Sequence, residues 1–256
     1  MTGFLIRKNF YDLWDNLFRI ALLNIGFILS LAIPVFIPPF LPSPVLQTGI
    51  ILTGVLWCFI YLSAAALSLK AVSDYGDFGF ADFFMNLKII WPMGLFMGGL
   101  ACLSYLLFTV VIPFYLSMNS MPGLLLAALV FWAQVIVVLA LQFFFAVRSR
   151  LDTNLFKIIK KCFIIFLDNP LFCIFTLIHN LVMLILSGFL AFLFPGPAAI
   201  LLFLDEGLRL RLLKYDWLEA NPQANRREIP WDELLSDDKE KTGTRSIRGL
   251  FFPWKD

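Results

Sequence analysis

The chain has 256 residues, of which 60% are hydrophobic, 16% aromatic and 15% charged, and its mean hydropathy is +0.84. Soluble domains contain about 25% charged residues, and 29 phenylalanines are more than one aqueous core can bury. This composition excludes a soluble enzyme, a disordered protein and a nucleic-acid binder. It predicts an integral membrane protein, whose net charge of +2 indicates no particular partner.

Three long stretches of the chain, 20–69, 89–147 and 169–204, carry no charged residue. A helix needs about 20 apolar residues to cross a bilayer, so the first two stretches each have room for two spans. In chain order, the predicted spans are 18–36, 47–69, 89–115, 124–147 and 170–194, followed by a sixth helix at 197–213. The predicted fold is all-α: a polytopic transmembrane helix bundle with about six spans in three hairpins over residues 1–219, and a short cytoplasmic tail over residues 220–256.

The positively charged residues are distributed unevenly between the two sides of this predicted bundle. The turns at 37–46, 116–123 and 195–197 carry no charge, whereas all 20 Lys and Arg residues lie on the other side or in the sixth helix. Cytoplasmic loops of membrane proteins carry an excess of Lys and Arg. The charged side is therefore predicted to face the cytoplasm, with both termini on it, in the bacterial inner membrane.

An amphipathic segment precedes each predicted hairpin. In 151–166, apolar residues recur at helical spacing, while Lys157, Lys160 and Lys161 fill other positions. Such a helix lies in the headgroup plane of a bilayer. The segments 10–14 and 80–84 are similar, so we expect three interfacial elbows.

The sixth helix is unusual because its apolar run, 198–204, is only seven residues long. Asp205, Glu206 and Arg209 follow, and a full span would place them at membrane depth at a cost of about 2.5–3.5 kcal/mol each. Arg209 lies three and four residues from the two acids, so pairing within the helix would offset part of this cost. These charges are candidate functional residues if they lie at depth, and solvated surface groups if the helix is a half-span.

Uncharged polar residues also occur within the predicted spans, namely Asn24, Gln134, His179 and Asn180. They could line a path for a small solute, although polar residues in spans more often hydrogen-bond to neighbouring helices. His179 is the only histidine, and the cysteines show no CxxC spacing. Neither a metal-binding motif nor a nucleophile motif is present. We therefore expect no catalytic residue, no metal site and no cofactor.

The C-terminal segment, 221–256, is polar but keeps aromatic residues that disordered tails usually lack. A short helix is predicted over 231–241. The aromatic residues could pack on the bilayer interface or on the bundle's own loops, or they could bind a cytoplasmic or membrane protein. The expected partners are thus the lipid bilayer and, in the last case, such a protein, with no nucleic acid. The candidate anchors are Trp231, Phe252, Pro253 and Trp254.

Parts of the first 91 residues resemble the YesL-like family of bacterial membrane proteins. The residues that carry the resemblance are Leu13-Trp14-Asp15-Asn16-Leu17, Leu22-Leu23-Asn24 and Pro34, together with Phe80, Phe83, Phe84, Lys88 and Trp91. The resemblance extends over residues 8–214. It implies a six-helix inner-membrane protein of undefined biochemical role, often associated with carbohydrate uptake systems, and it transfers no catalytic residue.

Together these features favour a non-catalytic accessory, scaffolding or regulatory membrane protein. It would engage a partner through its cytoplasmic tail and, on the resemblance, would be linked to a transport system. The alternative is a small-solute or lipid transporter that uses the intramembrane polar residues. A membrane enzyme is the third hypothesis.

Overall fold

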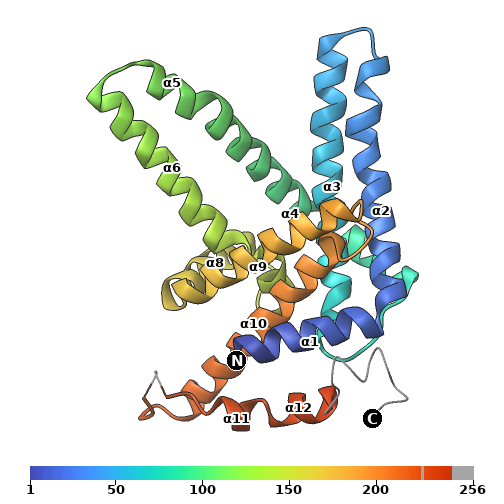
Figure 1. The fold of residues 1–256 in the computed structure, drawn as a ribbon, viewed down its shortest axis with the longest axis vertical. Helices are drawn as coiled ribbons and strands as arrows, with labels where there is room; N and C mark the ends of the chain where they lie inside the picture. The colour runs from blue at the N-terminus through green and yellow to red at the C-terminus, as the bar shows by residue number, and fades with distance from the viewer. Residues whose placement is uncertain (226–227, 244–256) are drawn as a thin grey trace.

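The computed structural model describes residues 1–225 and 228–243, which contain helices and no β-strand (Figure 1). The all-α prediction is confirmed for these residues. The longer helices are α2 (Leu17–Phe36), α3 (Pro44–Ser73), α4 (Phe80–Leu106), α6 (Met121–Leu141), α9 (Pro170–Phe189) and α10 (Gly196–Ala220). The shorter ones are α1 (Thr2–Asp15), η1 (Pro38–Phe40), η2 (Leu107–Val111), α5 (Ile112–Ser117), α7 (Phe144–Arg150), α8 (Leu155–Asp168), α11 (Trp231–Leu234) and α12 (Ser236–Thr242).

Within the described residues, five helical segments are long and apolar enough to cross a membrane, and each overlaps one of the first five predicted spans. Their length and composition indicate a multi-pass membrane protein. The sixth predicted span is not confirmed, because Asp205, Glu206, Arg209 and Arg211 interrupt the apolar sequence of α10. The five segments are Leu17–Phe40, Pro44–Ser73, Phe80–Ser117, Met121–Arg150 and Pro170–Phe189.

Two long hairpins share one end of the molecule and diverge towards the other (Figure 1). The first consists of α2 and α3, and the second of α4 and α5 paired with α6. Near the middle of α3, α4 packs closely on it, because Gly94 and Gly98 have no side chains to separate the two helices. A Cβ atom on Gly94 would lie only 2.5 Å from the Cα of Ile60. The far half of α4 leaves α3, and its Tyr105 and Leu106 are exposed.

The third hairpin, α9 with α10, is shorter, and its turn lies beside the middle of α2 (Figure 1). Asn24 of α2 holds this turn: its Nδ2 donates to the carbonyl oxygens of Leu193 and Pro195 at 3.0 and 2.9 Å, and its Oδ1 accepts from the Ala198 amide at 3.1 Å. Asn24 is seven residues into α2, or about 10 Å from its start. The apolar part of α10, 196–204, extends roughly 13 Å. The turn of this hairpin therefore does not reach the far end of α2 and α3.

Separate helices occur at two of the three predicted elbows, and their position in the headgroup plane stays a prediction. Helices α1 and α8 are separate helices, and in α8 Ile158 and Cys162 are buried while Lys157 and Lys160 are exposed. The expected elbow at 80–84 is instead the first turn of α4. The Asp82 carboxylate accepts a hydrogen bond from the Gly79 amide at 2.8 Å, which caps the helix at this point, and α4 then continues without a break.

The tail folds back onto the shared end of the bundle. The single helix predicted over 231–241 is two short helices, α11 and α12, which meet at Leu235. This break allows the buried Leu235 side chain to join the core that contains Leu208 and Phe143. Trp231 packs against the same core. The other predicted anchors, Phe252, Pro253 and Trp254, lie outside the described residues.

Candidate functional site: a buried charge network

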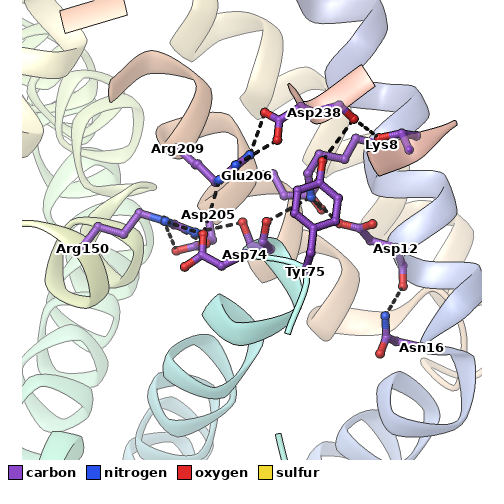
Figure 2. A network of polar contacts seen from close by, with 12 residues as sticks. Lys8, Asp12, Asn16, Asp74, Tyr75, Arg150, Asp205, Glu206, Arg209 and Asp238 are labelled. Atoms are coloured by element: carbon purple, nitrogen blue, oxygen red, sulfur yellow. Dashed lines mark hydrogen bonds and ion pairs between the residues drawn. The ribbon is translucent and has the colours of Figure 1, made fainter. Parts of the chain in front are cut away.

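Charged side chains from α1, α7, α10, α12 and the end of α3 meet at the shared end of the bundle (Figure 2). We call this group the charge network. It contains the three charged residues predicted as candidates, Asp205, Glu206 and Arg209. The complete set is Lys8, Asp12, Asp74, Tyr75, Arg150, Asp205, Glu206, Arg209 and Asp238.

Lys8 joins α1 to α3 and α10. Its fully buried ammonium group donates to the Asp12 carboxylate one helical turn along, to Glu206 Oε1 at 3.3 Å and to the Ser73 carbonyl oxygen at 3.1 Å. Ser73 ends α3, where the last carbonyl groups lack partners inside the helix and carry partial negative charge. One buried cation thus satisfies three acceptors from three helices.

Arg150 of α7 connects α10 to the same end of α3. Its guanidinium group binds both carboxylate oxygens of Asp205, with Nε at 3.1 and 3.0 Å. It also donates to Asp74 Oδ1 and Ser73 Oγ, each at 2.9 Å. The planar guanidinium presents several donors in a fixed fork, so this one side chain holds α7, α10 and the end of α3 in register.

Arg209 attaches the tail to the network. It binds Asp238 of α12 through two parallel hydrogen bonds of 2.9 Å, and its Nε lies 3.3 Å from Asp74. Bidentate pairs of this kind are stronger and more directional than single contacts. The Tyr75 ring lies beside them, with Lys8 Nζ 4.3 Å and Arg209 Cζ 5.5 Å from its centroid. Lys241 Nζ approaches the same ring to 5.2 Å.

Acidic groups outnumber basic ones in the network. It contains three cationic side chains, Lys8, Arg150 and Arg209, and five carboxyl groups. Complete burial raises the pKa of Glu206 well above its ordinary value, although nearby Lys8 acts in the opposite direction. The Glu206 carboxyl group therefore holds its proton more tightly in the folded state than an exposed glutamate does.

The pairing predicted inside α10 is wrong. Arg209 binds Asp238 and Asp74, whereas Asp205 binds Arg150 and Glu206 binds Lys8. The partners of these three residues come from three other helices, α7, α1 and α12. Arg150 binds both Asp205 and Ser73, the last residue of α3, and this contact favours a half-span for the sixth helix over a complete span. The expectation of solvated surface groups is wrong for Asp205 and Glu206, which are buried.

The uncharged polar candidates lie away from the network, within the apolar helices. Asn24 is buried at the α9–α10 turn, as described above. The His179 ring stacks on Phe203 of α10, with 3.6 Å between ring centroids. Gln134 of α6 and Asn180 of α9 are both buried. For Asn24, the hydrogen bonds favour a role in joining helices over a role in lining a solute path.

Sequence reasoning did not single out Lys8, Asp12, Asp74, Arg150 or Asp238. The sequence did contain a signal for the first four of them. Lys8 and Asp12 precede the first predicted span, and Asp74 and Arg150 follow the second and fourth, so all four lie on the predicted cytoplasmic side. Their partners could not be assigned, since Lys8 and Glu206 are 198 positions apart and Arg150 and Asp205 are 55 apart.

No metal site is evident in the described part of the chain, where no three His, Cys, Asp or Glu side chains are grouped to hold an ion. No protein-family model, curated protein or solved structure matches the chain. The resemblance to the YesL-like family therefore stays a prediction.

Proposed function

We propose that this chain is a non-catalytic protein of the bacterial inner membrane, with the end that carries the charge network in the cytoplasm. The support is the distribution of charge: the turns at the far ends of the two long hairpins, 37–43 and 118–120, carry none. Cytoplasmic surfaces of membrane proteins are rich in Lys and Arg. In this topology α2, α3, α4–α5 and α6 cross the membrane, the α9–α10 hairpin enters and returns, and both termini are cytoplasmic.

The role that we propose is accessory or regulatory: the protein engages a partner through its tail, residues 220–256, within a transport system. The observation that carries this proposal is the bidentate pair between Arg209 of α10 and Asp238 of α12. It joins the tail to the same network as α1, α3 and α7. A change in the packing of these helices would therefore alter the docking of the tail, which is the physical requirement for a regulatory output.

The alternative, a solute transporter, has less support. It requires polar groups along a continuous path, whereas Asn24 is engaged at the α9–α10 turn. Gln142, at the end of α6, donates in turn to the Cys173 carbonyl oxygen of α9 at 2.9 Å. Both side chains join helices to each other. Flux of a small solute in liposomes that is lost in a Gln134→Leu or Asn180→Leu variant would favour the transporter instead.

The proposal is tested by affinity capture from mild detergent. Full-length protein is compared with a chain that ends at Ala220 and with a full-length Trp231→Ala variant. We expect specific proteins to be retained by the full-length chain and lost from the shortened one. Equal capture by both chains, or capture by neither, would contradict the accessory role. A Trp217→Ala variant, altered before the tail begins, is the matched control for loss of an aromatic ring.

A further inference from the structure

A cavity of about 510 Å³ lies between α2, α3 and the first turns of α4, separate from the charge network. Its volume is in the range of small-molecule sites, about 300–1,000 Å³. The buried rings of Tyr61 and Phe83, whose centroids are 5.1 Å apart, form its floor. Phe18, Phe80 and Phe84 form its rim and are 74%, 66% and 58% exposed. The cavity is therefore an apolar groove that opens on the outer surface of the helices.

The groove has two different ends. One is at Ser30 and Trp57, where the indole Nε1 donates to Ser30 Oγ at 3.2 Å. The other is at Arg19, near the start of α2. Arg19 and Ser30 are eleven residues apart on one helix, or roughly 16 Å. This distance is close to half of a hydrocarbon core of about 30 Å. The groove thus has the length of one acyl chain in a single leaflet.

The Arg19 end carries one positive and one negative charge. Arg19 pairs with Asp77, which belongs to the loop between α3 and α4, and it also donates to Asn16 Oδ1 at 3.0 Å. The Asp77 side chain is 75% exposed and that of Arg19 is 37% exposed. A pair this exposed contributes only about 0–1 kcal/mol, so both groups can turn to a ligand. The mouth of the groove therefore offers a guanidinium for an anion and a carboxylate for a cation.

The geometry points to a binding site for phosphatidylethanolamine from the surrounding leaflet, with an acyl chain in the groove, its phosphate on Arg19 and its ammonium on Asp77. Guanidinium groups recognise phosphate through paired hydrogen bonds. A primary ammonium donates up to three hydrogen bonds, whereas the quaternary ammonium of phosphatidylcholine donates none. Phosphatidylglycerol has no cation to offer Asp77. This assignment is independent of the role proposed for the tail.

The test is native mass spectrometry of delipidated, full-length protein. Phosphatidylethanolamine, phosphatidylcholine and phosphatidylglycerol with identical acyl chains are added separately at equal concentration. We expect a one-to-one complex that is about fivefold more abundant with phosphatidylethanolamine, the effect of about 1 kcal/mol from one exposed ion pair. Equal abundance of the three complexes would overturn the proposal.

Four variants distinguish the contribution of the apolar groove to lipid binding from that of the charged residues at its mouth. Leu22→Trp fills the groove and should abolish the preferred complex, whereas Leu29→Trp, at an exposed position of α2 outside the groove, should preserve it. Asp77→Asn should equalise phosphatidylethanolamine and phosphatidylcholine. Arg19→Gln should weaken all three lipids. Identical binding by the two Trp variants, or an unchanged preference in Asp77→Asn, would also overturn the assignment. If Leu22→Trp fails to fold, Asp77→Asn still tests the assignment, because Asp77 lies in a loop.

Discussion

At the scale of single residues, the defining feature is a buried lysine that faces a buried glutamate. Removing an ion pair from water costs more than the attraction returns unless additional hydrogen bonds satisfy the charges. Lys8 has those bonds, to Asp12 and to the Ser73 carbonyl oxygen. Glu206 is deeply buried with Lys8 as its cationic partner, and burial raises its pKa. The stability of the folded state therefore depends on whether the carboxyl group of Glu206 is protonated.

Glu206 gives a pH prediction with a definite sign. Its pKa is higher in the folded state than in the unfolded chain, so the folded state binds more protons. The free energy of unfolding should therefore fall as pH rises above about 4.5. The fall is about 1.4 kcal/mol for each pH unit between the pKa of Glu206 in the unfolded chain and its pKa in the folded state. Glu206→Gln removes this titration. We expect a flatter dependence of the melting temperature between pH 5 and pH 8, measured by thermal unfolding in detergent.

Asp205 supplies the contrast for that measurement. It binds Arg150 through both carboxylate oxygens, so Asp205→Asn leaves the buried guanidinium with Asp74 but without its bidentate partner and should lower the melting temperature across the whole pH range. A Glu206→Gln variant that keeps the pH dependence of the unaltered protein would show that another group causes it.

At the scale of helices, the α9–α10 hairpin differs most from the sequence-based prediction. Its turn was expected at the far side of the bilayer, but Asn24 holds it beside the middle of α2. The four charged residues in the centre of α10 remain at the shared end, where the network pairs three of them. In the proposed topology the hairpin therefore stops at partial depth, because a full crossing would draw these charges into the apolar region.

Labelling of introduced cysteines tests this depth. A thiol reagent confined to the outer side of the membrane should modify cysteines placed at the tips of the long hairpins, at the half-buried Ser43 and the exposed Asn119. It should not reach a cysteine at Leu193, although this side chain is on the surface of the helices. Equal labelling at all three positions would mean that the α9–α10 hairpin crosses completely. The unaltered protein, with its four native cysteines, gives the background.

At the scale of the whole molecule, the bundle and the tail form one structure at the end that holds the network. Leu235 lies in the core, and Asp238 is held by Arg209. The two long hairpins, in contrast, diverge at the other end (Figure 1). The side chains that connect different helices through charge are thus concentrated where the tail docks, and loss of one of them should release the tail before it unfolds the spans.

Amide hydrogen exchange tests this coupling. Arg209→Gln removes both hydrogen bonds to Asp238, worth about 1.5 kcal/mol or more, and should accelerate exchange in α12 by about tenfold with little change in α3. Asp232→Asn is the matched control, because it disrupts only the exposed pair between Asp232 and Lys239 on the surface of the tail. Equal exchange rates in the two variants would contradict a tail held by Arg209.

Local features of the sequence determined the class of protein, the first five apolar helices and the ability of α4 to approach a neighbouring helix closely. Each depends on residues near one another in the chain: some twenty apolar positions in succession, or glycines one helical turn apart at 94 and 98. In a bilayer, every spanning segment must satisfy its backbone hydrogen bonds within its own helix. A span can therefore be identified from consecutive residues alone.

The tertiary structure alone decided the pairing of the charges, the position of the α9–α10 turn beside α2 and the groove beside Arg19. Asp205, Glu206 and Arg209 are neighbours in α10, yet each binds a residue from a different part of the chain. Spacing within one helix predicted that they would pair with one another. The choice among charged partners depends instead on which helices pack around α10, since a buried charge is stabilised by the opposite charge nearest to it in space, however distant that residue is in sequence.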